Sequence, residues 1–410
     1  MIGGLMKRGS IFAVAAAASI FSTSAMAADL GGDCCADLEE RVAELEATTA
    51  RKGNRKVSLS VSGHVNELMY WWDNGDERNV YIGTSGFSSS RFRFKGDAKI
   101  SDDWSAGYLM ELEVVSAQVN SNTASNDDGS GTNVRLRHSA WYLQSKRLGK
   151  FTMGHTSFAA DDIQSSIQVG GTPTATQGNI EGAPGMALNF GNTAVTVFNV
   201  FDVRDVDRGN LIRYDSPSLA GFVLSAAWGE DDRWDVALRY AGEFNGIKIA
   251  AGIGYHQDTE PEQGQPVNYN ELRMAGGVLH VPTGLFVEGG YLHREFDETD
   301  GQRLRVGNIR DDFDYWYLHA GIFRKFIALG KTSFFGEYGH VEGSAQQSVR
   351  NFNDNEGRYY GIGVNQYIDA AAMEIYLGWR HFEADLVTAG NVNLNPDDVD
   401  TVYTGARISF

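Results

Sequence analysis

Arginine alternates with apolar residues in several segments of the sequence. Arg91 and Arg93 flank Phe92, and Arg135 and Arg137 flank Leu136. Because alternate side chains of an extended strand point to opposite faces, these arginines share the face opposite the apolar one. The complete set is Arg91, Arg93, Arg135, Arg137, Arg213 and Arg239. Like charges on one surface repel one another, so solvent or carboxylates on a facing segment must offset them.

Such carboxylates occur in the longest stretch without alternation, from about residue 156 to 207. Asp161, Asp162 and Glu181 are its acids before Gly185. If they face the arginines across water, the field between them orders water, penalises apolar solutes and sets an ion preference. The plainer alternative is that the arginines are solvated residues, hydrogen-bonded along one wall.

Extended strands are the elements that must position these charges. From Lys56 onward the sequence divides into segments of roughly ten residues with period-two alternation, separated by turn residues. In "RWDVALRYAGEF" (233–244), Trp234, Val236 and Leu238 alternate with Asp235 and Arg239. Almost no helical periodicity occurs in this part of the sequence. The pattern therefore predicts an all-β protein.

Three features favour a transmembrane barrel over a soluble β-sandwich, which alternates as well. Short and long connections between the segments alternate, as in "SDDW" (101–104) and "NSNTASNDDGSGTN" (120–133). Aromatic residues cluster at segment ends, as in Trp141-Tyr142 and Trp316-Tyr317, where an interfacial girdle needs them. A signal peptide together with a strand that ends at Phe410 is the arrangement of bacterial outer-membrane barrels.

The alternating segments predict about 16 antiparallel strands, an even number that leaves the N- and C-terminal ends of the chain on the same, periplasmic side. They lie near 57–70, 87–100, 104–117, 132–145, 148–155, 208–216, 220–229, 233–244, 246–257, 268–281, 284–296, 313–326, 331–342, 357–368, 371–384 and 400–410. A barrel of this size encloses an aqueous channel. The last strand should pair with the first, because every backbone polar group in a bilayer needs a partner. The strand-like stretch 186–201 forms either a hairpin within the loop or two further wall strands.

The N-terminal region has the features of an exported protein. Residues 1–27 are predicted to be a cleaved signal peptide, with Lys7 and Arg8, an apolar run (11–21) and a small-residue cleavage site (25–27). The apolar run is shorter than the roughly 20 residues that a spanning helix needs. The composition, with a formal net charge of −18, argues against nucleic acid as a partner.

Residues 28–55 are predicted to form a short periplasmic helical segment, ahead of a barrel that occupies 56–410. Leu38, Val42 and Leu45 have coiled-coil spacing, so the segment is either a three-stranded stub or a solvated helix. Cys34 and Cys35 are adjacent and so resist bridging each other; they either link neighbouring chains or stay reduced.

Three blocks of the sequence resemble general bacterial porins. "RLRHSAWYLQSKRLGKFTMGHTSF" (135–158) looks like the strand, turn and strand before the constriction loop of that family, and "GNLIRYDSPSLAGFVLSAAWGE" (209–230) resembles the strand after it. The segment 28–65 is similar to the start of alphaproteobacterial porins. The resemblance covers essentially the whole chain after residue 27.

This resemblance implies a homotrimer and an inward-folded constriction loop at 156–207. It also implies that Phe410 is the terminal aromatic that outer-membrane proteins present to the barrel-assembly machinery. The loop has no Pro-Glu-Phe-Gly-Gly box, so its conformation cannot be copied from enterobacterial porins.

The expected function is an outer-membrane porin of a Gram-negative cell, a water-filled channel for passive diffusion of small hydrophilic solutes and ions. Its expected partners are outer-membrane lipid and lipopolysaccharide, with peptidoglycan a further possibility through the N-terminal helix. The alternative is a substrate-specific sugar channel, which would need a ladder of aromatics in the lumen. Tyr315 and Tyr317 are the only candidates for such a ladder.

An outer-membrane enzyme is the alternative from a different class. It would need a nucleophile, a base and an orienting group within reach of one another. The nine histidines are dispersed, and the sequence has no zinc-ligand spacing, P-loop or dinucleotide fingerprint. We therefore expect no catalytic residue, no cofactor and no metal site.

Overall fold

The computed structural model describes residues 56–117, 133–172, 187–191, 193–201, 203, 206–259, 268–296, 312–343, 352–388, 391–394 and 396–410. The predicted signal peptide (1–27), the predicted periplasmic helix (28–55) with its two cysteines, and Glu181 lie outside these residues.

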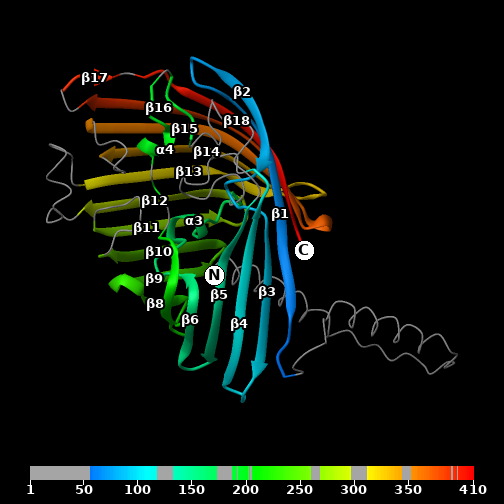
Figure 1. Cartoon of the computed structure of the whole chain (residues 1–410). Coiled ribbons are helices and arrows are strands. Elements are labelled where there is room, and N and C mark those ends of the chain that lie inside the picture. The colour runs from blue at the N-terminus through cyan, green and yellow to red at the C-terminus, as the bar shows by residue number, and fades with distance from the viewer. Residues whose placement is uncertain are drawn as a thin grey trace, which may run out of the picture.

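The strands form one antiparallel sheet that closes on itself (Figure 1). They are β1 (Ser60–Asp73), β2 (Arg78–Thr84), β3 (Arg91–Lys99), β4 (Trp104–Val115), β5 (Asn133–Ser145), β6 (Gly149–Ser157), β7 (Arg208–Asp215), β8 (Phe222–Gly229), β9 (Trp234–Phe244), β10 (Ile247–Asp258), β11 (Tyr269–His280), β12 (Leu285–Phe296), β13 (Asp312–Ile327), β14 (Gly330–Gly343), β15 (Phe352–Ile368), β16 (Met373–Thr388), β17 (Asn393–Leu394) and β18 (Val399–Ser409). The helical pieces are α3 (Ile163–Ser166), α4 (Val197–Val200) and two single 3-10 turns, η2 (Glu230–Asp232) and η5 (Asp369–Ala371). In the part of the chain that the structure describes, no helix is long and apolar enough to cross a membrane.

The barrel wall has 16 strand positions, as the alternation predicts. β1 pairs with β3 along its first residues and with β2 along the rest, so β2 and β3 share one position. β17 is a two-residue strand that pairs only with the end of β16. The sequence prediction missed these two short strands. It also began the second strand at 87, whereas the structure interrupts the wall between Thr84 and Arg91.

The first and last strands close the barrel, which confirms the predicted pairing. β1 and β18 are antiparallel from His64 opposite Ser409 to Asp73 opposite Asp400. Beyond the ladder, the N–H of Gly63 donates to the carbonyl of Phe410 (2.9 Å), and the N–H of Phe410 donates back to Gly63 (3.1 Å). The pairing leaves the wall without a free edge.

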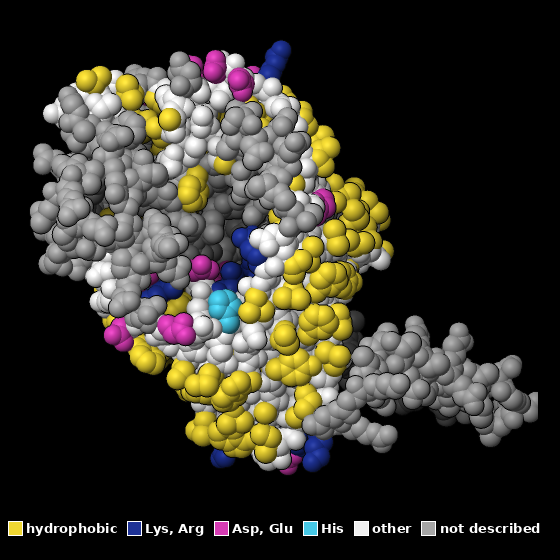
Figure 2. Space-filling view, viewed as in Figure 1, with side chains coloured by type: hydrophobic (Ala, Val, Ile, Leu, Met, Phe, Trp, Pro, Cys, Tyr) yellow, Lys and Arg dark blue, Asp and Glu magenta, His cyan; other side chains and the backbone are white. Residues whose placement is uncertain are grey.

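Burial along the strands is the reverse of that in a soluble protein. On β9, Trp234, Val236 and Leu238 are exposed, whereas Asp235 and Arg239 on the alternate positions are buried. Figure 2 shows apolar side chains over much of the outer surface and basic side chains inside the hollow. An outward apolar face and an inward polar face are the arrangement of a transmembrane barrel.

The aromatic clusters divide between the two faces. Trp141, Trp316 and Tyr360 are exposed on the outer surface, as a girdle requires. Their sequence neighbours Tyr142, Tyr317 and Tyr359 are buried on the inner face. Adjacent residues of a strand cannot both face the lipid, so only one residue of each of these pairs can lie in the girdle.

The stretch 186–201 adds no wall strands among the residues that the structure describes. Asn189 and Thr196 form an isolated antiparallel bridge, and α4 follows with Thr196 as its N-cap. These residues therefore belong to the segment between β6 and β7, and they form the hairpin of the two alternatives left open by the sequence.

Candidate functional site

The segment after β6 lies against inward-facing side chains of the barrel wall. α3 sits inside the ring of strands in Figure 1, and its closest strands are β10, β11 and β12. We call residues 158–172 the inner loop. Its course is set by side chains of the wall that bond to its backbone.

The first attachment point is a buried carboxylate on β9. Asp235 accepts the N–H of Ala159 (2.9 Å) and of Ala160 (2.6 Å), one on each oxygen. Beside it, Arg239 donates to the carbonyl of Asp161 at 2.7 Å. A carboxylate that accepts two consecutive backbone N–H groups fixes the direction of the chain there.

Arg213 on β7 adds to this first attachment. It donates to the carbonyls of Ser157 (3.1 Å) and Phe158 (2.8 Å), and it pairs with Asp215 through two of its nitrogens. Arg213 and Arg239 are both nearly fully buried. They therefore hold the start of the inner loop and present little charge to the lumen.

Glycines on the wall make room for the middle of the inner loop. A Cβ on Gly252 would lie 2.2 Å from Cδ1 of Ile167, and one on Gly254 would lie 2.7 Å from Cβ of Ala160. Ile167 is buried in this recess, as is Ile163. The apolar side of α3 thus packs into a shallow recess that exists because these wall positions carry no side chain.

The second attachment point is Glu288 on β12, which is 2% exposed. Its Oε2 accepts the N–H of Val169 (2.7 Å) and of Gly170 (3.0 Å), and its Oε1 accepts the hydroxyl of Thr172 (2.9 Å). Ser333 then donates to the carbonyl of Gly170 at 2.6 Å. The inner loop is therefore held at both ends by buried carboxylates.

Aromatic residues fill the inner face farther round the wall. Phe201, which follows α4, packs edge-on against Tyr359 (6.0 Å between ring centres) and Phe382 (5.8 Å). Arg380 forms a two-pronged pair with Glu337 (2.7 and 2.8 Å) and lies over the Tyr359 ring. All of these side chains are buried.

Tyr315 and Tyr317 point inward and stack with ring centres 5.8 Å apart. Their hydroxyls bond to Tyr359 and to the carbonyl of Gln164. At 0% and 2% exposure they form no accessible surface for a sugar ring. The observation weighs against the sugar-channel alternative.

The opposite part of the wall carries a cluster of charges on β3, β4 and β5. We call it the basic cluster, and it comprises Arg91, Arg93, Arg135, Arg137, Glu111 and Glu113. Glu111 contacts three of the arginines: Arg93 at 2.6 Å, Arg137 at 2.9 Å and Arg91 at 3.4 Å. Glu113 contacts Arg135 (3.2 Å) and Arg137 (3.6 Å).

Exposure within the basic cluster is uneven. The side chains of Arg93 and Arg135 are 46% and 48% exposed, whereas those of Glu111 and Glu113 are 1% and 7% exposed. The carboxylates lie beneath the guanidiniums and offset part of their mutual repulsion. A solute in the lumen therefore meets positive groups first.

An inward bulge, residues 85–90, borders this cluster. Phe87 packs against Tyr403 (5.1 Å between ring centres), while Arg91 donates to the Ser89 carbonyl (2.9 Å) and the Ser88 hydroxyl (3.3 Å). The bulge includes residues 87–90, which the sequence prediction placed at the start of a strand. Its backbone and hydroxyls fix the orientation of Arg91.

The structure brings four of the six predicted arginines together and places the other two under the inner loop. Asp161 is buried, and Asp162 lies within electrostatic range of Arg137 and Arg239. The sequence reasoning missed Glu111 and Glu113, although "ELE" places both on the arginine face of its strand. It also missed Asp235 and Glu288, for which a lone acid on an inward stripe was the only signal.

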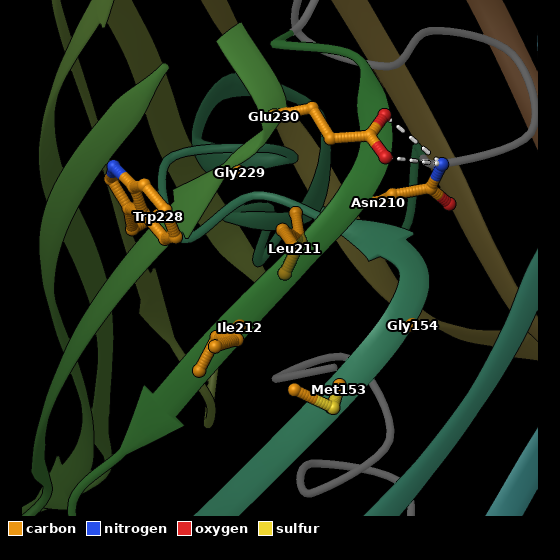
Figure 3. A pocket seen from close by; sticks show the side chains of 8 residues that line it. All are labelled: Met153, Gly154, Asn210, Leu211, Ile212, Trp228, Gly229 and Glu230. Atoms are coloured by element: carbon orange, nitrogen blue, oxygen red, sulfur yellow. Dashed lines mark hydrogen bonds between the residues drawn. The ribbon is translucent and has the colours of Figure 1, made fainter. Parts of the chain in front are cut away.

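A shallow groove of about 260 Å³ lies elsewhere, on the outer face of β6, β7 and β8. Met153, Ile212 and Trp228 line its apolar part. At its rim, both carboxylate oxygens of Glu230 accept a hydrogen bond from the side-chain amide of Asn210 (Figure 3). Because Met153 and Trp228 face outward, the groove is separate from the lumen. Within the described ranges, no group of three or more His, Cys, Asp or Glu residues is placed to hold a metal ion.

Comparison with known proteins agrees with this architecture. A family model described as Gram-negative porin matches residues 13–389. No curated protein matches the chain. Sequence identity to the solved structures is low, so the structural similarity shows the fold alone.

Three solved structures illustrate that fold. The anion-selective porin from Comamonas acidovorans superposes with a TM-score of 0.58 at 16% identity, over 86% of this chain and 100% of that chain. In-vitro folded OmpT of Vibrio cholerae, in its trimer form, gives 0.54 at 14% identity, over 86% and 99%. OmpF of Salmonella typhi in complex with daunomycin gives 0.51 at 14% identity, over 88% and 99%.

Proposed function

Because the chain belongs to the Gram-negative porin family, it is an outer-membrane channel for passive diffusion of small hydrophilic solutes and ions, and we propose that it prefers anions. The observation that carries this preference is the exposure of Arg93 and Arg135 above the buried Glu111 and Glu113. Exposed guanidiniums in a narrow, water-filled passage with low-dielectric walls raise the local anion concentration.

We propose that the passage is narrowest between the inner loop and the basic cluster. The hydrogen bonds that Asp235 and Glu288 accept from the loop backbone support this placement, because they hold the loop on the side of the wall away from the basic cluster. In this proposal the charge of Asp162, which interacts electrostatically with Arg137, is opposite in sign to the basic cluster, so a transverse field acts on permeating solutes. In this arrangement Arg213 and Arg239 act by holding the loop.

We further propose that the functional unit is a homotrimer, by analogy with the trimer form of OmpT. Phe410 is proposed as the residue that the barrel-assembly machinery recognises, and lipopolysaccharide as the lipid around the outward apolar face. Residues 28–55 are proposed to reach peptidoglycan. A diffusion channel needs no catalytic residue, cofactor or metal.

Reconstitution in a planar bilayer tests the proposed preference. Under a KCl gradient, the sign of the reversal potential reports whether chloride or potassium permeates better. We expect the anion sign and conductance steps in groups of three. A reversal potential of the cation sign would refute the preference, and block of the current by sugar would support a substrate-specific channel.

A further inference from the structure

We propose that the basic cluster is a binding subsite for small multivalent oxyanions, of which phosphate and sulfate are the simplest. The proposal rests on the anion preference proposed above and adds that certain anions bind in the lumen as well as pass through it. Its basis is the arrangement of the guanidiniums around two buried carboxylates on three neighbouring strands.

Strand register brings the guanidiniums together in two rows. Arg91, Glu113 and Arg135 lie opposite one another across β3, β4 and β5. Arg93 lies opposite Glu111 in the next row, where a bulge on β5 brings Arg137 close to the same carboxylate. Four guanidiniums therefore gather above two carboxylates.

Their positions are fixed before any ligand arrives. Glu111 accepts a hydrogen bond from Nε of Arg93 and another from Nε of Arg137. Arg91 is held by its hydrogen bonds to Ser88 and Ser89 of the bulge. A guanidinium whose rotamer is already restricted loses little entropy when it binds an anion. The basic cluster is thus organised as a receptor and differs from a set of freely moving surface arginines.

The chemistry favours oxyanions over chloride. A guanidinium is a planar fork of N–H donors that matches two oxygens of a phosphate, sulfate or carboxylate group. Arg93 and Arg135 are the two members that combine a fixed partner with a side chain about half exposed to the lumen. A tetrahedral oxyanion can accept hydrogen bonds from more than one fork, whereas chloride has no such geometry to match.

The charge balance supports a multivalent ligand. The cluster holds four arginines and two glutamates, so it carries a net positive charge that a dianion offsets better than a monovalent ion does. Arg208 and its partner Asp207 (3.8 Å) add one charge of each sign nearby. Asp162 on the inner loop interacts electrostatically with Arg137 of the cluster, and its negative charge opposes anions there.

Titration of the chloride current with inorganic phosphate and with sulfate tests the subsite in reconstituted channels. At an ionic strength of about 0.1 M, where the screening length is about 10 Å, we expect either dianion to reduce the current in a saturable way. Arg93→Gln should weaken this block about tenfold or more, since it removes a charge-assisted fork. Arg147→Gln is the matched control, because Arg147 is exposed on the β5–β6 turn outside the cluster.

Arg93→Lys separates charge from geometry. Lysine keeps the charge but has no planar fork, so the anion preference should remain while the dianion block weakens. Unblocked current in the wild-type channel, with a reversal potential of the anion sign, would overturn the subsite and leave the proposed function intact. Equal block in wild type and Arg93→Gln would also overturn it. Heat-dependent gel mobility verifies that each variant forms a folded barrel.

Discussion

Glu288 is the residue whose replacement tests most directly how the inner loop is held. Glu288→Gln keeps the size of the side chain but removes its charge, while Val169, Gly170 and Thr172 remain in place as donors. A hydrogen bond to a charged acceptor is worth roughly 1 kcal/mol more than one to a neutral acceptor. Removing the charge from the acceptor of three such bonds weakens the attachment by about 2–3 kcal/mol, which raises the detached population about 30-fold to 150-fold.

Single-channel recording is the assay for this change. A loop that detaches more often should produce larger current noise and a higher mean conductance, and it should admit larger neutral sugars in a vesicle-swelling assay. The barrel itself should keep its heat-dependent gel mobility, because Glu288 lies in an intact strand ladder. Glu230→Gln is the control, since the Glu230 side chain accepts hydrogen bonds from Asn210 at the rim of the outer groove in Figure 3, outside the inner loop.

Wild-type noise, conductance and sugar cut-off in Glu288→Gln would refute the reasoning at one of two points. Either the inner loop does not limit the passage, or its other contacts hold it without the carboxylate. Asp235→Asn distinguishes these outcomes, because it weakens the attachment at the opposite end of the loop. If the double variant also behaves as wild type, the inner loop is not the constriction.

Three further substitutions test the wall. Arg380→Met removes the arginine partner of the buried Glu337 and should destabilise the barrel by about 3–5 kcal/mol, seen as a lower unfolding temperature in gel-mobility assays; the double variant with Glu337→Gln should recover most of this loss. Gly63→Ala would place Cβ 2.2 Å from a β3 carbonyl oxygen at the seam, so the refolding yield should fall sharply. Leu318→Arg puts a charge on the outward face and should cost about 2–4 kcal/mol in lipid, against about 0–1 kcal/mol for Leu329→Arg in a turn.

The wall of the barrel was predictable because a single rule governs it. Alternation decides which side chains meet lipid, and each wall strand obeys it independently of the fold around it. The interruption at 85–90 escaped because Phe87 continues the apolar pattern in sequence, yet it turns inward to pack on Tyr403. That contact joins residues far apart in the chain, so local pattern carries no trace of it.

The candidate site was predictable only in part for the same reason. The arginine stripe follows from alternation, but the division between exposed and buried members depends on where the inner loop lies. Arg213 and Arg239 have the same sequence context as Arg93, and only the course of the loop makes them attachment points. From the sequence, Glu288 cannot be distinguished from any other acid facing the lumen. Its role depends on the backbone N–H groups of Val169 and Gly170, which donate to it in the folded structure.

The seam between β1 and β18 has a consequence for how the protein is made. Neighbouring hairpins can form as soon as two consecutive strands are available, but this pair joins segments from opposite ends of the barrel sequence and carries the largest loop-closure cost. Until it forms, two strand edges hold unpaired N–H and C=O groups that hydrocarbon cannot satisfy. A half-built barrel is therefore unstable in lipid, and membrane insertion has to be coupled to the joining of the two ends.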